Sequence, residues 1–265
     1  MPIAIRHGAS LSWEKQGDGP ALILGAGLGG VGAYWAPNMA ALTAHFTVYR
    51  FDQRGTGGSS REPVVSVEQM SADLIAVMDD AGLERAMYLG HSTGGAIGVA
   101  TALDYPDRIS AMMIYASTTH GDAYRRKILG LRSRLFGELG VAAYAGYSTL
   151  LLYPPYWINA HQEEIAASER AAPDQLGSAD IQVSRFEAIL NFDRRAELSR
   201  IAIPTLVVCA EDDILTPKYF SEEFVRLIPG ARGHFVARGG HALSRTEPEL
   251  FNEIAIEFFQ GASTG

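Results

Sequence analysis

The sequence of 265 residues contains only one cysteine, Cys209. A single cysteine excludes a disulfide within the chain and a zinc site built from cysteines. The chain also lacks the opening of a secretory signal, since Arg6, His7, Glu14 and Lys15 interrupt its first twenty residues. We therefore expect a protein of the reducing cytoplasm.

Basic residues are in the minority, with 22 Lys and Arg against 30 Asp and Glu and a net charge of −8. An acidic chain repels phosphate backbones, so we expect no nucleic-acid partner. The uncharged segment 20–44 is broken by glycines and by Pro37, so we expect no membrane span there. No paired-histidine motif is present, and we expect neither a metal nor a cofactor.

Apolar residues are plentiful, at 47% of the chain, which is enough for a sizeable core. Short apolar runs alternate with helical patterns. The runs predict a hairpin within 3–15 and strands at 21–24, 46–51, 86–89, 111–115, 205–209 and 234–236. Apolar residues at three- and four-residue steps predict helices over 67–81 and 248–259, the first with a capping box at Ser66 and Gln69. This alternation indicates a parallel sheet that is covered by helices on both faces.

The alternation stops between residues 120 and 203, where no convincing strand is found. A helical insertion between two strands of a parallel sheet is typical of a cap over an active site. We therefore predict a core formed by 1–119 and 204–265 and a helical cap formed by 120–203.

The strongest local motif is Gly90-His91-Ser92-Thr93-Gly94, which fits G-x-S-x-G between an apolar strand and a helix of small residues. A strand that turns at once into a helix forces its corner residue into a strained conformation, and side chains at Gly90 and Gly94 would collide there. The turn would project the hydroxyl of Ser92 outward. A glycine-rich turn without catalysis is the competing interpretation.

A serine nucleophile needs a base that is held by a third group. Asp213 follows one late strand and His241 follows the next, so both are expected at the carboxyl ends of their strands. The chain order of serine, acid and histidine is the one expected for this triad architecture. Asp212 is the competing acid, although it could instead cap the following helix, and His91 and His234 are less suitable bases because one adjoins the serine and the other lies within a strand.

An acyl-transfer serine also needs donors for the oxyanion. The glycine-rich loop after the first parallel strand offers the N–H of Leu28, and the residue after the serine offers the N–H of Thr93. The same loop formally fits a dinucleotide fingerprint, Gly25-x-Gly27-x-x-Gly30, with Asp52 as a ribose-binding acid. This alternative leaves Ser92, Asp213 and His241 unexplained.

With these motifs in place, the chain resembles the α/β-hydrolase superfamily over nearly its whole length. The resemblance rests on 25–35, 52–59, the turn at Ser92, Asp213 with Pro217, and Gly240-His241. It implies an α/β-hydrolase fold, with a mostly parallel eight-stranded sheet, helices on both faces and a helical cap. It also implies Ser92 as nucleophile, His241 as base and Asp213 as its partner. Ala26 departs from the histidine that many members carry, which affects the hydrogen bonding of the loop.

Within this superfamily the chain is most similar to the aminoacrylate hydrolases of pyrimidine utilisation. The similarity includes the cap segment 152–157 and the segments 27–35 and 103–106. It implies cleavage of a C–N bond in a small, acidic catabolite. Enol-lactonases, carboxylesterases and C–C hydrolases of ring-cleavage products stay open as neighbouring activities, and a ligand receptor on the same fold is the non-enzymatic alternative.

Basic residues cluster at the start of the predicted cap, where they could bind the carboxylate of an acidic substrate. On a helix, Arg125 and Arg132 would share one face. A solvated helix face is the simpler interpretation, and a substrate-carboxylate site at Arg125 or Arg132 is the sharper one. Trp157 is a further candidate for the pocket, beside its alternative role in packing. The expected partner is a small molecule, and a homodimer stays open.

Overall fold

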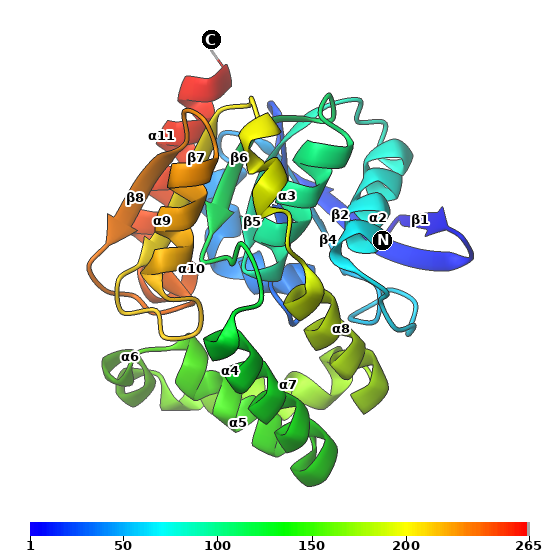
Figure 1. Cartoon of the computed structure of the whole chain (residues 1–265). Coiled ribbons are helices and arrows are strands. Elements are labelled where there is room, and N and C mark those ends of the chain that lie inside the picture. The colour runs from blue at the N-terminus through cyan, green and yellow to red at the C-terminus, as the bar shows by residue number, and fades with distance from the viewer. Residues whose placement is uncertain (264–265) are drawn as a thin grey trace.

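The computed structural model describes residues 1–263 and contains a sheet with strand order β1-β2-β4-β3-β5-β6-β7-β8 (Figure 1). The strands are β1 Ile3–Arg6, β2 Ala9–Gln16, β3 Ala21–Gly25, β4 Thr47–Phe51, β5 Ala86–His91, β6 Ile109–Tyr115, β7 Thr205–Ala210 and β8 Arg232–Val236. The strands from β3 to β8 pair in parallel, whereas β1 and β2 form an antiparallel hairpin and β2 pairs with β4 in antiparallel fashion. The predicted fold class is confirmed, with a mixed sheet because the hairpin extends one edge.

Helices cover both faces of the sheet, and alternate residues of its strands point to them. In β5, Tyr88 belongs to the core formed with α2 Val67–Asp80, α3 Thr93–Asp104 and α9 Lys218–Leu227. Its neighbour Leu89 belongs to the core on the other face, with η1 Gly32–Asn38, α1 Met39–Leu42, α10 Leu243–Thr246 and α11 Pro248–Ser263. Strands that are buried on both faces explain why their sequences are continuously apolar.

The predicted helix over 67–81 begins as the capping box indicates. The hydroxyl of Ser66 accepts a hydrogen bond from the Gln69 N–H at 3.2 Å, and the Gln69 side chain accepts from the N–H of Val65 at 2.7 Å. Gly82 follows the helix in a left-handed conformation, with φ at 71°. Glycine adopts this conformation without strain, and it therefore ends the helix.

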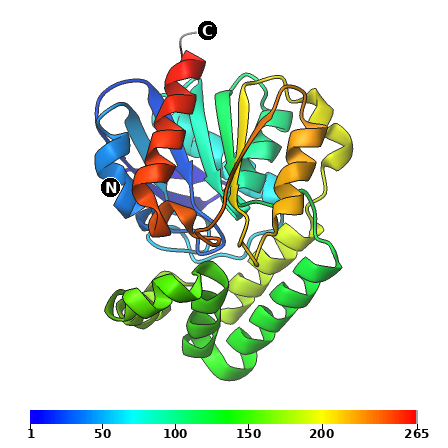
Figure 2. The same cartoon turned by 90° about the vertical axis from the view of Figure 1, so that its left-hand side faces the viewer.

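Residues 123–191 form helices that lie together beyond the carboxyl ends of the parallel strands (Figure 2). They are α4 Ala123–Arg134, the π-helical turn η2 Leu135–Leu139, α5 Gly140–Leu152, α6 Pro155–Ala160, α7 Gln162–Gln175 and α8 Ala179–Asn191, and η3 Arg195–Arg200 leads back to β7. We refer to α4–α8 as the cap. The predicted division into core and cap uses residues 1–265, of which the last two lie outside the described residues.

Within residues 1–263, one helical run, Ala123–Leu152, is long and apolar enough to cross a membrane by length and composition. The run reverses at Gly140, where φ is 83° and ψ is 178°. Arg132 on α4 consequently reaches Tyr144 and Ser148 on α5 with hydrogen bonds of 2.7 and 3.1 Å. The run is thus two helices packed side by side, and α5, at about 1.5 Å per residue, is shorter than a bilayer core of about 30 Å.

Candidate active site

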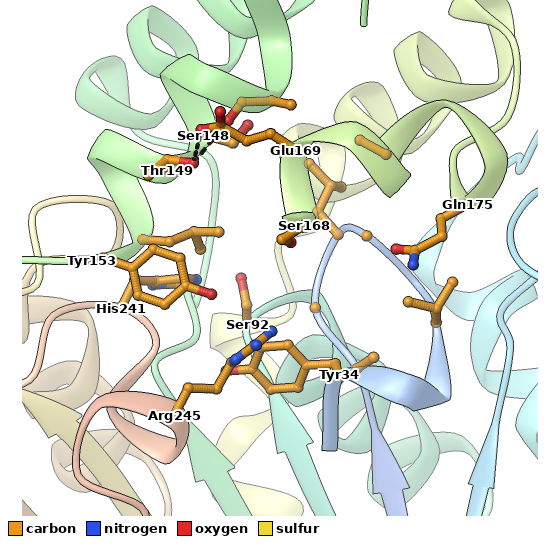
Figure 3. A pocket seen from close by; sticks show the side chains of 18 of the residues that line it. Tyr34, Ser92, Ser148, Thr149, Tyr153, Ser168, Glu169, Gln175, His241 and Arg245 are labelled. Carbon is orange, nitrogen blue, oxygen red and sulfur yellow. Dashed lines mark hydrogen bonds between the residues drawn. The ribbon is translucent and has the colours of Figure 1, made fainter. Parts of the chain in front are cut away.

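Ser92 lies at the turn between β5 and α3 in the conformation that the motif predicts. Its φ is 53° and its ψ is −116°, a strained combination for a residue other than glycine. A Cβ at Gly90 would lie 2.4 Å from the carbonyl oxygen of Gly94, and a Cβ at Gly94 would lie 2.3 Å from that of Gly25. Only glycine fits at both positions, and the turn directs Ser92 into a cavity between core and cap (Figure 3).

Asp213 and His241 form a buried pair at the ends of β7 and β8. His241 Nδ1 lies 2.8 Å from Asp213 Oδ2, and the two side chains are 1% and 0% exposed. Asp213 Oδ1 accepts from the N–H groups of Leu215 at 2.7 Å and Thr216 at 2.9 Å, and the Thr216 hydroxyl donates to Oδ2 at 2.7 Å. These bonds fix the carboxylate, which in turn orients the imidazole.

Ser92 and His241 line the same cavity. In the described residues the Ser92 hydroxyl makes no hydrogen bond, and Figure 3 shows it directed into the cavity beside the imidazole. The structure therefore brings together the three residues that the sequence singled out. Hydrogen bonds between catalytic groups are often formed only when the substrate is bound.

The competing acid and bases occupy other positions. Asp212 accepts a hydrogen bond from the Gly240 N–H at 2.8 Å and makes no cap at α9, so it holds the loop that carries His241. His234 is exposed on β8.

His91 is buried beside Ser92 and stacks between the rings of Tyr34, at 4.6 Å, and Tyr115, at 4.7 Å. Its Nε2 lies 3.1 Å from the backbone oxygen of His241 and donates to it, because a carbonyl can only accept. Burial, and secondarily His241, lower the pKa of His91 well below its usual value. His91 is therefore a neutral support for the His241 backbone, which the Tyr115 hydroxyl also holds, at 2.8 Å.

The loop that carries Leu28 packs directly against Ser92. A Cβ at Gly27 would lie 3.2 Å from the Cβ of Ser92. Leu28 lines the cavity, whereas the Thr93 side chain is buried outside it. Within residues 1–263 neither of the two N–H groups donates a hydrogen bond to the backbone or to a side chain, so both are free to act as donors.

The dinucleotide alternative does not fit the contacts of Asp52. Its two carboxylate oxygens accept from the N–H groups of Gly32 and Gly58, each at 2.8 Å. These bonds tie two loops together and occupy the acid that a ribose would need. The glycine-rich loop continues into the 3₁₀ helix η1 rather than a long helix that begins at the fingerprint.

The cavity has a volume of about 350 Å³, which suits a small molecule. Of the predicted substrate-binding residues, Arg132 and Trp157 line it. Arg125 does not line it, because its guanidinium donates to the carbonyl of Leu215 at 2.9 Å. Arg125 and Arg132 share the buried face of α4 as predicted, while Arg126 is exposed.

Three charged side chains in the cavity wall were not found by sequence reasoning. Arg245 on α10 pairs with Glu164 on α7 at 3.0 Å, and Glu169 on α7 accepts from the Thr149 hydroxyl at 2.6 Å. Arg245 follows His241 by four residues, a spacing that would place it near the site. The acids lie in a helix whose orientation no motif reveals.

A fourth residue that sequence reasoning missed, Arg185, is a buried cation behind the glycine-rich loop. It is 0% exposed and donates to the carbonyls of Leu28 at 3.1 Å and Arg54 at 2.8 Å, and to the side chain of Gln53. Burial lowers its pKa to about 10. It remains a cation at neutral pH and connects α8 to the loop beside Ser92.

The chain is similar to known proteins both in sequence and in structure. Residues 20–151 match a family model described as alpha/beta hydrolase fold. Relatives named "Putative carbamate hydrolase RutD" include one from Caulobacter sp. (strain K31), 36% identical over 92% of both chains, and one from Azorhizobium caulinodans, 36% identical over 97% of this chain and 98% of the relative. Among solved structures, the enol-lactonase from Burkholderia xenovorans LB400 is 25% identical with a TM-score of 0.90, covering 98% of this chain and all of that one.

Proposed function

Because the chain belongs to the α/β-hydrolase fold family and is a hydrolase, we propose that it uses Ser92, His241 and Asp213 as a catalytic triad on a small, carboxylated catabolite. The observation that carries the proposal is the buried His241–Asp213 pair, whose histidine lines one cavity with a serine held at a strained turn. The chain order and the geometry agree with the triad of this fold.

The proposed reaction begins when Ser92 Oγ attacks the substrate carbonyl carbon. His241 Nε2 takes the hydroxyl proton, while its Nδ1–H donates to Asp213. The carbonyl oxygen becomes an oxyanion, for which the N–H groups of Leu28 and Thr93 are the proposed donors. Collapse of this intermediate breaks the bond to the leaving group, which takes the proton from His241. Water then hydrolyses the acyl-serine by the reverse sequence of proton transfers.

We propose that the bond broken is a C–N bond, as in a carbamate or amide. Relatives whose names describe them as carbamate hydrolases match the chain over nearly its full length. Cleavage of an enol-lactone is the second candidate, because an enol-lactonase shares the whole fold with a TM-score of 0.90. Arg132, which lines the cavity, is the proposed carboxylate-binding residue, with Trp157 as part of the wall. We place the enzyme in the cytoplasm, where its single, buried Cys209 would stay reduced.

The test is covalent labelling by a fluorophosphonate, which reacts with activated serines. We expect stoichiometric labelling of the folded protein and none in the Ser92→Ala variant. His241→Ala should also prevent labelling, because the hydroxyl would lose its base. Labelling that survives in Ser92→Ala, or is absent from the folded wild-type protein, would contradict the proposed triad.

A further inference from the structure

Tyr153 lines the cavity with a hydroxyl that has no task in the fold. Figure 3 shows this hydroxyl directed into the cavity on the side where it approaches Ser92. Among residues 1–263 it makes no hydrogen bond. Burial raises the pKa of Tyr153 above its usual value, so the phenol stays protonated at neutral pH. A proton donor is therefore available to a ligand in the cavity.

The backbone beside Tyr153 packs against the loop that carries His241. The carbonyl of Leu152 accepts a hydrogen bond from the N–H of Ala242 at 3.0 Å. A Cβ at Gly240 would lie 2.9 Å from the same carbonyl oxygen, so only glycine lets the two segments approach so closely. Tyr153 is consequently anchored next to the base of the proposed triad.

The phenol ring is held in place by a stack of aromatic rings. The centroids of Tyr153 and Trp157 are 4.3 Å apart with an interplanar angle of 16°, and those of Trp157 and His161 are 4.1 Å apart with an angle of 11°. Nδ1 of His161 donates to the backbone oxygen of Trp157 at 2.9 Å, which fixes the outer ring. The hydroxyl is thus oriented before a substrate binds, as a donor that acts in a transition state requires.

The space beside His241 is where the leaving group departs in the proposed reaction. The leaving atom takes its proton from Nε2 of His241, so it must lie next to that nitrogen. Negative charge builds up on a leaving oxygen as its bond to the carbonyl carbon breaks, before this proton arrives. The N–H groups of Leu28 and Thr93 are assigned to the other oxygen, the oxyanion, and so a separate donor is needed here.

We propose that Tyr153 is a catalytic residue whose hydroxyl forms a hydrogen bond with the leaving group. The hydroxyl donates to a leaving oxygen, and it accepts from the N–H of a leaving nitrogen, whose lone pair stays free for the proton from His241. Tyr153 keeps its own proton, so the proton transfers of the proposed reaction are unchanged. The inference rests on the proposed function, because it takes Ser92 as the nucleophile and His241 as the base.

The test measures kcat/KM of Tyr153→Phe with two esters that share an acyl group. Phenylalanine keeps the ring that stacks on Trp157, and the fold loses no hydrogen bond, so the Tm should not change. The charge on a leaving phenoxide stays on its oxygen, whereas a 4-nitro group withdraws it, so phenyl acetate depends more on the donor than 4-nitrophenyl acetate. We expect kcat/KM to fall by about tenfold or more for phenyl acetate and by about threefold or less for 4-nitrophenyl acetate.

Tyr156→Phe is the matched control for the loss of a phenol hydroxyl. Tyr156 belongs to the same segment, but it is 43% exposed and lies outside the cavity wall. Both of its kcat/KM values should equal those of the wild-type protein. A loss in Tyr153→Phe that is equal for the two esters, or no loss for either, would overturn the assignment.

Labelling of Ser92 separates this inference from the function on which it rests. If Ser92 reacts with the fluorophosphonate but Tyr153→Phe does not discriminate between the esters, the role of Tyr153 is wrong and the triad stands. If Ser92 is inert and neither ester is hydrolysed, the proposed function fails and the role of Tyr153 fails with it.

Discussion

Burial fixes the protonation state of individual side chains around Ser92. His91 is enclosed by aromatic rings, donates to the backbone of His241, and has a pKa well below its usual value. A neutral imidazole there keeps a second positive charge away from His241. The residue adjoining the proposed nucleophile consequently holds the backbone of the proposed base.

This protonation state has a consequence for the pH dependence of stability. Below about pH 6.5, the ordinary pKa of histidine, the unfolded chain binds a proton at His91 that the folded chain does not. The stabilisation is complete above that pH and is lost as the pH falls, with a slope of up to about 1.4 kcal/mol per pH unit. In His91→Gln we expect the slope of the unfolding free energy against pH to be smaller between pH 6.5 and 5, by up to about 1.4 kcal/mol per pH unit, which corresponds to the uptake of one proton. Denaturant unfolding at several pH values measures it, with the exposed His234→Gln as control; equal slopes in wild type and His91→Gln would contradict the interpretation.

Arg132 allows a second prediction for a single residue. Arg132→Met removes the guanidinium but keeps much of the apolar length, so we expect KM for a carboxylate-bearing ester to rise by about tenfold or more. The KM for neutral 4-nitrophenyl acetate should change little. Steady-state kinetics with 4-nitrophenyl monosuccinate and the neutral ester provide the comparison. Arg126→Met on the exposed face of the same helix is the control, and equal losses on both esters would show that Arg132 is structural.

At the scale of elements, one cap helix supports the loop beside the serine. Arg185 on α8 has no carboxylate partner within 4.0 Å in the described part of the chain and is held by carbonyl and amide oxygens. Gln53 continues the connection, since its amide donates to the carbonyl of Ala26 at 2.7 Å. A buried cation is costly, and three directed donors in one plane are what arginine offers over lysine. The arrangement ties the position of α8 to that of the loop that carries Leu28.

We therefore predict that Arg185→Lys lowers kcat more than it raises KM. Lysine keeps the charge but cannot reproduce the planar set of donors, so the Leu28 N–H should be less well placed for the oxyanion. Loss of one oxyanion donor costs about 100-fold or more in kcat, and a displaced donor should cost at least tenfold. Steady-state kinetics with 4-nitrophenyl acetate measure kcat and KM, with the enzyme concentration taken from active sites titrated by fluorophosphonate. The Tm of each variant is measured in parallel. A lower Tm with unchanged kcat per active site would show that Arg185 only stabilises the fold.

At the scale of the whole molecule, the sequence predicts the core far better than the cap. The positions of Ser92, Asp213 and His241 follow from short-range rules, because each comes after a strand and the carboxyl ends of parallel strands meet at one edge of a sheet. The cap contacts depend on how helices pack over that edge, which periodicity does not specify. Arg125 and Arg132 share a helix face, yet Arg125 donates to the carbonyl of Leu215 and does not line the cavity. The same holds for α7 and α8. Their packing against the core determines where Glu164, Glu169 and Arg185 lie.

An ion pair between the cap and the core is weaker than the packing within the core, and this difference predicts where the molecule opens. Glu164 on α7 meets Arg245 on α10 at the cavity wall, with side chains that are 48% and 20% exposed. Such a pair contributes at most about 1 kcal/mol to the free energy of unfolding and is weakened by salt. The sheet, in contrast, is stabilised by apolar burial on both faces. In Glu164→Gln we expect the Tm to change by only a few degrees, while amide exchange in α7 accelerates by up to about fivefold. Exchange in β5 should not change.

Added salt should accelerate amide exchange in α7 of the wild-type protein and have little effect in Glu164→Gln. The control variant Glu163→Gln should behave as the wild type. If α7 exchanges equally fast in wild type and Glu164→Gln, the ion pair does not hold the cap to the core.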